Sequence, residues 1–407
     1  MTLSKNIDFE KVVYSSVLLF SFIIPLSRGM ISFFIFWFFI LLLYKREYTD
    51  TFQTLKSNPI FAYISAFLLY MALTLFWSED IKEGLNQIRL YGYWVLVLPA
   101  MAVLVKKEWL WSMLTAFLLG MFVSEILAYG MFFDLWTIKG KDSSYPTPFM
   151  THIHYSIFLA FTAILLLSRV LSQGLSFYEK LPYTFFFLIS TANLMFSTGR
   201  AGQLAFFVSL VVLIILKFKI SIKSIFLSML SVAMIFFMAY NSLDLFKKRA
   251  DEGVRDIKHI MNENYNSSFG ARVVFWLIAG EVLKEKPLLG NGVGDFIVST
   301  KDVLSRKDYG LTKGTVDFMR EQHFHNQYLM VAVQGGLIGL ALMFLLFYKF
   351  FSLNMQDREL KEVSILGFVV IMVSFVAEPI WMLQFPLTLF LFIASISMVA
   401  AKKERLQ

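Results

Sequence analysis

A polar stretch with two histidines holds the residue types best suited to acid–base chemistry. It covers residues 320–327, reads Arg-Glu-Gln-His-Phe-His-Asn-Gln, and contains His323 and His325, two of the chain's five histidines. A long apolar segment, residues 328–351, follows it directly. A histidine at the mouth of a membrane helix is either an interfacial side chain or a proton acceptor beside a membrane-embedded site. Because neutral imidazole can take a proton near pH 7, His325 beside Asn326 is the candidate general base.

Three arginines form the second group of candidates. Arg200 lies in the tight turn Ser-Thr-Gly-Arg-Ala-Gly, where small neighbours let the guanidinium and backbone amides approach one ligand together. Arg272 opens a helical pattern after Phe-Gly-Ala, and Arg89 begins an apolar segment. Arginine forks match phosphate oxygens, so several of them suit a pyrophosphate. Arg200 can instead extend toward anionic lipid headgroups.

Other polar residues lie within or beside apolar segments. His152 and His154 open one segment, Glu125 lies inside another, and Glu378 lies near the end of a third. An acid in such a place raises a functional question, and either one can pair with an arginine. The two histidines have no nearby carboxylate, and metal sites usually need three or four ligands. The sequence therefore predicts no metal and no cofactor.

The composition is that of a membrane protein. Of the 407 residues, 57% are hydrophobic and 16% are charged, whereas soluble domains are roughly 45–50% apolar and about 25% charged. Cysteine is absent, which excludes disulfides and thiolate chemistry. We therefore expect an all-α polytopic membrane protein. The formal net charge of +8 then concerns membrane orientation, and no nucleic-acid partner is expected.

Apolar segments long enough to cross a bilayer predict about twelve transmembrane helices. They fall near residues 12–27, 30–44, 60–77, 89–105, 109–133, 152–171, 182–198, 202–217, 221–241, 325–351, 362–378 and 383–401.

These segments divide the chain into three parts. Residues 1–241 hold the first nine helices, residues 242–322 form one large loop, and residues 323–407 hold the last three. Lysine and arginine gather in the termini and in alternate short connections. By the positive-inside rule, both termini are then cytoplasmic and the large loop lies outside.

The large loop is predicted to contain helices. Residues 243–264 form an amphipathic pattern whose charges suit a solvated face, and residues 272–284 form a second helical pattern. Residues 288–296 are rich in glycine, and after a helix they favour a tight turn over a dinucleotide-binding loop. Residues 297–319 are polar and are expected to be mobile or lid-like.

A base and several arginines on the outer face suit one reaction in particular, glycosyl transfer from a polyprenyl-pyrophosphate sugar. The acceptor hydroxyl attacks the anomeric carbon while His325 removes its proton. The arginines stabilise the departing pyrophosphate.

Three stretches resemble the O-antigen ligase family of bacterial inner membranes, which also includes O-antigen polymerases. They are residues 197–202 around Arg200, residues 268–272 ending in Arg272, and residues 323–326 followed by the glycines of 335–339. In that family the two arginines are assigned to the lipid-linked pyrophosphate and the histidine to activation of the acceptor. The resemblance carries these roles to Arg200, Arg272 and His325. It adds Arg89 as a further basic position, and we expect His323 and Asn326 to support the base.

The resemblance also implies an architecture and partners. The architecture is that of a GT-C-like glycosyltransferase with one large periplasmic loop. The donor is an undecaprenyl-pyrophosphate-linked glycan, and the acceptor is lipid A–core. The protein would lie in the bacterial inner (cytoplasmic) membrane with its active site in the periplasm.

Three alternatives remain open. An O-antigen or capsule polymerase uses the same donor with another lipid-linked glycan as acceptor, and a protein-glycosylating relative is a further option. A transporter of the lipid-linked glycan needs ionisable groups through the whole membrane depth and often has symmetric halves. Here the candidate residues gather at the outer end and no internal repeat is found, which favours an enzyme.

Overall fold

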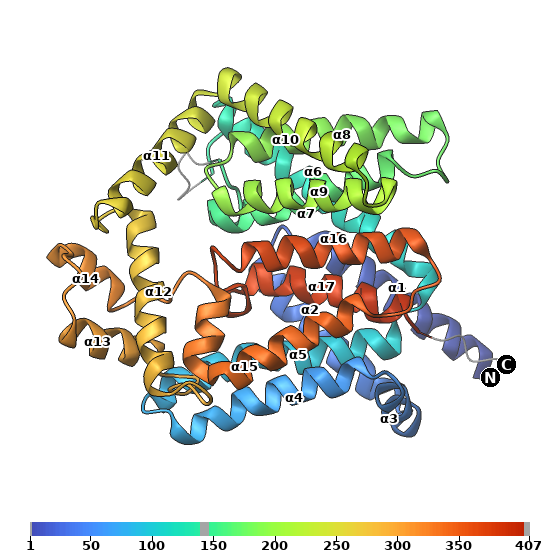
Figure 1. Ribbon diagram of the computed structural model, residues 1–407. Helices are drawn as coiled ribbons and strands as arrows, with labels where there is room; N and C mark the ends of the chain where they lie inside the picture. Colours follow the sequence, from blue (N-terminus) through green and yellow to red (C-terminus); the bar gives the residue numbers. More distant parts are fainter. Residues whose placement is uncertain (1, 139–145, 403–407) are drawn as a thin grey trace.

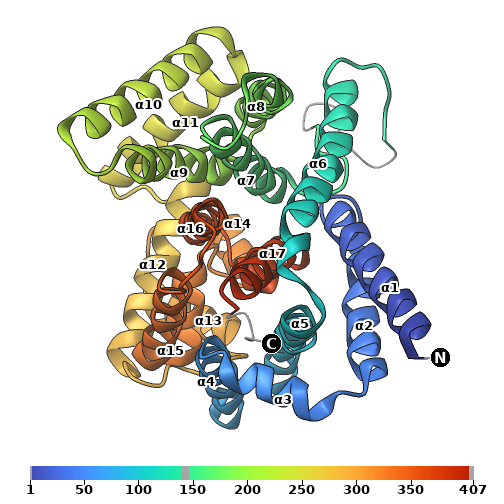
Figure 2. The ribbon, with the colours of Figure 1, turned by 90° about the vertical axis from the view of Figure 1, so that its right-hand side faces the viewer.

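Long helices run side by side through most of the protein (Figure 1). A computed structural model describes residues 2–138 and 146–402, and every regular element in these ranges is a helix. The predicted all-helical class is therefore confirmed. Helices α11 to α14 cross one end of the bundle, and the two chain ends lie at the opposite end (Figure 1). An end-on view shows α17 in the interior with other helices around it (Figure 2).

The helices before the large loop are α1 (Thr2–Ile23), α2 (Arg28–Lys45), α3 (Tyr48–Ser57), α4 (Ile60–Leu73), η1 (Thr74–Trp77), α5 (Ile81–Leu104), η2 (Lys107–Trp109), α6 (Leu110–Phe132), α7 (His152–Val170), α8 (Phe177–Phe196), α9 (Arg200–Phe218) and α10 (Ile222–Ser242). Those of the loop and the C-terminal part are α11 (Asp244–Met261), α12 (Ser268–Glu285), α13 (Phe296–Arg306), α14 (Lys313–Met319), α15 (Gln327–Phe351), α16 (Arg358–Ser374), η3 (Ile380–Met382) and α17 (Gln384–Ala400).

The predicted apolar segments all lie on helices of the described ranges. Eight helical stretches there are long and apolar enough to cross a membrane, and α17 is apolar but shorter. The protein is thus a multi-pass membrane protein, whereas the number of twelve spans stays a prediction.

The large loop is more regular than its composition suggested. Helices α11 and α12 lie where amphipathic and helical patterns were predicted. Most of 297–319, expected to be mobile or lid-like, is helical, because these residues form α13 and α14 apart from the connection 307–312. On α13, Phe296 and Val303 recur at helical spacing and pack with Met319, Phe275 and Phe324 in a second apolar core.

The glycine-rich turn inserts into a break in α15. Helix α15 is interrupted at Gly336, where φ is 60° and ψ is −159°, although a continuous helix was predicted over 328–351. The turn fills the break, since Asn291 N–H donates to the Val333 carbonyl at 2.8 Å and Leu337 N–H donates to the Pro287 carbonyl at 2.9 Å. Backbone groups freed inside an apolar bundle need such partners.

We predict that Gly336→Ala destabilises the protein by roughly 1–3 kcal/mol, because its backbone conformation is essentially restricted to glycine. A Cβ atom at this position would also lie 2.3 Å from the Leu288 carbonyl oxygen. Thermal unfolding of the purified protein in detergent measures the effect. Gly280→Ala is the control, because a Cβ atom there meets nothing within 4 Å. Equal unfolding temperatures for the two variants would contradict the strained break.

Candidate functional site

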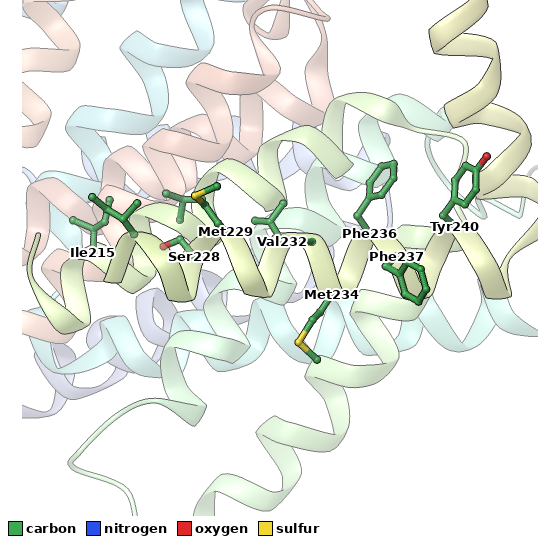
Figure 3. Close-up of a pocket in the computed structure, with 11 residues that line it drawn as sticks. Ile215, Ser228, Met229, Val232, Met234, Phe236, Phe237 and Tyr240 are labelled. Atoms are coloured by element: carbon green, nitrogen blue, oxygen red, sulfur yellow. The ribbon is translucent and has the colours of Figure 1, made fainter. Parts of the chain in front are cut away.

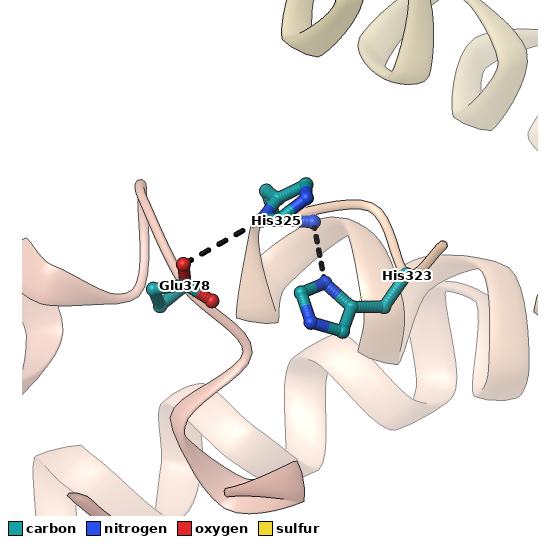
Figure 4. Close-up of side chains that lie close together, drawn as sticks. All are labelled: His323, His325 and Glu378. Carbon is teal, nitrogen blue, oxygen red and sulfur yellow. Dashed lines mark hydrogen bonds and ion pairs between the residues drawn. The ribbon is translucent and has the colours of Figure 1, made fainter. Parts of the chain in front are cut away.

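The candidate base faces a buried carboxylate. His325 Nδ1 lies 3.5 Å from Glu378 Oε1, and Glu378 lies in the connection between α16 and η3 (Figure 4). This is an ion-pair distance, but Nδ1 makes no hydrogen bond in this arrangement. Catalytic hydrogen bonds are often long before substrate binds. A carboxylate at Nδ1 favours the tautomer with its proton there, which leaves Nε2 as the proton acceptor.

Hydrogen bonds between the start of α15 and the end of α16 hold this pair together. Asn326 caps α15 by accepting from Leu329 N–H at 3.1 Å, and its amide donates to the Val376 carbonyl at 3.3 Å. Gln327 N–H donates to the Phe375 carbonyl at 2.8 Å. The residues beside His325 are therefore bound to the residues just before Glu378.

The backbone at His325 is left-handed, with a φ of 47°. Such a conformation is uncommon for a non-glycine residue, and strained backbone of this kind gathers at functional sites. It lets the His325 N–H donate to His323 Nδ1 at 3.2 Å (Figure 4). Burial lowers the pKa of His323 to about 4, and the neighbouring His325 acts in the same direction. His323 is therefore neutral at pH 7, and its Nδ1 is free to accept this bond.

Glu378 lies beyond the end of α16 and is buried. Burial by itself raises the pKa of its carboxyl, but the contact with His325 and the nearby His323 outweigh burial and lower it. Glu378 is therefore a carboxylate at pH 7.

The same three side chains can hold a metal ion. His323, His325 and Glu378 each offer a ligand atom, and these atoms lie within 4.8 Å of one another. No such ligand set was predicted, because the sequence places Glu378 far from both histidines. A metal on His325 would compete with its use as a base, so the two roles are separable by experiment.

A polar pocket of about 440 Å³ opens in front of His325, between α12 and α14. Arg272 and Phe275 form one wall, and Thr315 and Phe318 form another. The Phe318 ring is nearly parallel to the His325 imidazole, at 9° with the centroids 6.3 Å apart. Aromatic faces beside hydroxyl and guanidinium groups suit a carbohydrate bearing a reactive hydroxyl.

A second pocket of about 260 Å³ collects three arginines. Arg200 is the first residue of α9, Arg249 lies on α11, and Arg272 lies on α12. Arg272 also lines the polar pocket, so the two pockets adjoin at its side chain. The arrangement places cations next to the candidate base.

Carboxylates of α11 occupy part of the arginine pocket. Glu252 Oε2 accepts from Arg200 at 3.2 Å and from Arg249 at 2.8 Å, and Asp256 lies 3.6 Å from Arg200. A single oxygen shared by two guanidiniums is the position that a phosphate oxygen would take.

Arg272 has spare binding capacity. Its Nε is buried and makes no hydrogen bond within the described residues. Burial lowers the pKa of Arg272, and Arg200 lowers it further, while Glu378 opposes both. Since arginine stays charged in proteins, its positive charge here is only partly compensated. An anion bound in the pocket would complete the compensation.

The predicted site residues are brought together with one exception. His323, His325 and Asn326 form one cluster, and Arg200 and Arg272 share a pocket. Arg89 is exposed on α5 and lines neither pocket.

Arg249 and Glu252 were missed. Glu378 was noted as an acid that raises a functional question, with an arginine as one possible partner, and in the structure it contacts His325. The charges of α11 were interpreted as a solvated face, yet Arg249, Glu252 and Asp256 recur at helical spacing and line the arginine pocket. The spacing of these three residues places them on one face of a helix, and this was the signal in the sequence that could have identified them as site residues.

The fold is that of a multi-pass helical membrane protein, and the candidate base and the arginine pocket lie close together in it. Residues 185–344 match a family model described as O-antigen ligase. Arg200, Arg272 and His325 fall within this range, and the match confirms the resemblance of the three motifs to this family. Over 334 residues the chain is also 25% identical to an uncharacterized protein of Haemophilus influenzae, covering 78% of this chain and 79% of that protein.

We predict that Arg272→Ala weakens binding of inorganic pyrophosphate by roughly 10- to 100-fold, the loss typical of one or two charge-assisted hydrogen bonds. Calorimetry on the purified protein measures this affinity. Arg255→Ala is the matched control, because it removes an exposed arginine of α11 that does not line the pocket. An equal loss in both variants would mean that only the overall charge matters.

Proposed function

We propose that the protein is an O-antigen ligase. It transfers O-antigen polysaccharide from undecaprenyl pyrophosphate to a sugar hydroxyl of lipid A–core on the periplasmic side of the bacterial inner membrane. The observation that carries the proposal is that the pocket in front of the His325–Glu378 pair adjoins the arginine pocket at Arg272. A base and an anion pocket that share a wall suit a reaction in which a hydroxyl replaces a pyrophosphate.

In the proposed step the acceptor hydroxyl lies in the polar pocket beside His325 Nε2. Its oxygen bonds to the anomeric carbon of the donor sugar, and the bond from that carbon to the pyrophosphate oxygen breaks. The electron pair leaves with undecaprenyl pyrophosphate, and the hydroxyl proton passes to Nε2. The Glu378 carboxylate stabilises the imidazolium that forms, as the third member of a base–orienter arrangement does.

The arginines act on the departing group. Negative charge grows on the pyrophosphate as the bond breaks, and guanidiniums fixed nearby stabilise it without reorganising. Arg272 lies between the two pockets and suits the bridging position. Arg200 and Arg249 bind the remaining oxygens once the donor displaces Glu252. These cations take the role that a divalent ion has in other pyrophosphate chemistry.

The orientation is part of the proposal. Helices α11, α12 and α14, which line the two pockets, lie at one end of the bundle, and both chain ends lie at the other (Figure 1). With the site in the periplasm, the two termini are cytoplasmic. This is the orientation that the distribution of lysine and arginine favours.

A reconstitution tests the function. The purified protein is mixed with undecaprenyl-pyrophosphate glycan and lipid A–core, and the products are separated on a gel that resolves lipopolysaccharide. We expect glycan on lipid A–core, and its loss with His325→Ala. A ladder of longer lipid-linked glycans formed without lipid A–core would instead identify a polymerase. Donor binding with neither product would favour a transporter.

We predict different kinetic losses for the two members of the pair. His325→Ala lowers kcat by roughly 10²–10⁴-fold, the range for a general base. Glu378→Gln keeps the base but loses its orientation and charge, so kcat falls by on the order of 10²-fold with little change in the donor KM. Glu321→Gln removes an exposed carboxylate from the same segment and serves as the control. Full activity of a folded Glu378→Gln variant would contradict the role of this carboxylate.

We predict that chelation with EDTA leaves transfer unchanged and that added Zn²⁺ inhibits it. Zinc binds imidazole and carboxylate ligands, and at His323, His325 and Glu378 it would occupy the base. Initial rates at increasing metal concentration provide the measurement. Activity that EDTA abolishes and a divalent ion restores would show that the cluster is a working metal site.

A further inference from the structure

A further pocket, with a volume of about 840 Å³, lies at the end of the bundle that carries both chain ends (Figure 1). The last residues of α2, α5, α15 and α17 form its walls together with α3 and the connection after α15. It shares no lining residue with the polar pocket beside His325 or with the arginine pocket. A ligand bound here is therefore separate from the substrates of the proposed function.

Three lysines from three different helices line this pocket, which we call the lysine pocket. Lys45 is the last residue of α2, Lys349 lies in the last turn of α15, and Lys402 follows α17. All three are partly buried, so their stems pack on apolar neighbours while their ammonium groups reach polar space. The acids that line the pocket are Glu47 and Asp50. Its lysines therefore outnumber its acids.

Part of the positive charge is compensated. Lys45 Nζ lies 2.9 Å from Glu47 Oε2. Carbonyl groups at the C-terminal ends of helices attract cations, and Lys402 Nζ donates to the Val105 carbonyl, just after α5, at 2.9 Å. These contacts explain why lysines gather where several helices end.

The remaining positive charge is not compensated. The pKa of Lys402 is lowered to about 8, first by burial and then by the positive charges of Lys45 and Lys107. Lys349 forms no ion pair with a described residue, and its Nζ lies 6.0 Å from the centre of the Tyr63 ring. The carbonyls and acids around the pocket thus do not cancel the repulsion between its lysines. An anion bound among them would reduce this repulsion.

Helix α3 indicates that the pocket lies at the depth of lipid headgroups. It runs across the end of the bundle between α2 and α4 and forms one wall of the pocket (Figure 2). Most of its residues are polar, yet Tyr48 is 61% exposed and Phe52 is 67% exposed. Aromatic side chains on such a helix lie at the membrane–water interface. Headgroup phosphates are therefore available beside the pocket.

An apolar groove of similar size differs from the lysine pocket in its chemistry. It has a volume of about 850 Å³, lies between α9 and α10, and is lined by apolar side chains together with Ser228 and Tyr240 (Figure 3). Such a wall gains little over the surrounding lipid, because lipid chains are themselves apolar. The lysine pocket instead holds charged groups that can distinguish one headgroup from another.

We propose that the lysine pocket binds the phosphate group of a membrane phospholipid, with Lys349 and Lys402 as its cationic ligands. Lysine binds phosphate as a point charge, and basic pockets between transmembrane helices suit lipid headgroups. The volume of about 840 Å³ is that of a small-molecule site, so it has room for the rest of the headgroup. Asn354 and Gln356 also line the pocket, and their amides can bond headgroup hydroxyls. The proposal does not rest on the proposed function.

Native mass spectrometry of the purified, delipidated protein tests the pocket. The protein is titrated in separate experiments with phosphatidylglycerol, phosphatidylethanolamine and diacylglycerol, which has no phosphate. We expect a saturable adduct with at least one of the two phospholipids and none with diacylglycerol. Equal retention of diacylglycerol would overturn the proposal. If inorganic phosphate displaces the phospholipid at the same concentration, the pocket takes the free ion and the lipid assignment is wrong.

Lysine substitutions locate the adduct. Lys349→Gln and Lys402→Gln are each expected to lower phospholipid affinity by roughly fivefold, the effect of one lysine on attraction to an anionic headgroup. Lys402→Arg keeps the charge and is expected to retain most of the affinity. Lys56→Gln is the matched control, because it removes an exposed lysine of α3 that does not line the pocket. Thermal unfolding shows whether the variants remain folded. An equal loss in all three glutamine variants would mean that only the overall charge matters and would overturn the proposal.

Discussion

The hydrogen bonds between the start of α15 and the end of α16 are the constraint on which the site depends. They join Asn326 to Val376 and Gln327 to Phe375, and they place His325 beside Glu378. A base needs a neighbour that selects its tautomer and stabilises its protonated form. Here that neighbour is held by backbone carbonyls, so the pair does not depend on flexible side chains alone. The buried His323 supports the arrangement by accepting the His325 N–H.

Charge balance governs the other half of the site. Three arginines meet two carboxylates of α11, and Arg272 keeps an Nε without a hydrogen bond in the described part of the chain. Buried charges without partners are costly, so the acids of α11 stabilise the arginines of this pocket. A pyrophosphate carries more negative charge than Glu252 and has more oxygens to share. Binding of a pyrophosphate would therefore replace the Glu252 carboxylate with an anion that pairs more strongly with the same guanidinium groups.

The two pockets lie against different parts of the protein. The arginine pocket lies where the start of α9 meets α11 and the first turns of α12. The polar pocket lies under the loop helices α12 and α14. In the proposed function, the donor pyrophosphate would occupy the arginine pocket while a sugar acceptor reaches His325 through the polar pocket, so that the two substrates would meet at Arg272.

The sequence by itself determined the class of protein and pointed to its candidate site residues. Long apolar segments have few stable forms besides membrane helices, and residue type makes His325 a candidate base and Arg200 and Arg272 candidate anion ligands. Only the tertiary structure decided that Glu378 faces His325 and that α11 faces Arg200, because these contacts join segments that no local periodicity relates. Three further features are seen only in the tertiary structure: most of 297–319 is helical, α15 is broken at Gly336, and Arg89 is exposed. Each of these depends on packing against distant residues, which local propensity does not encode.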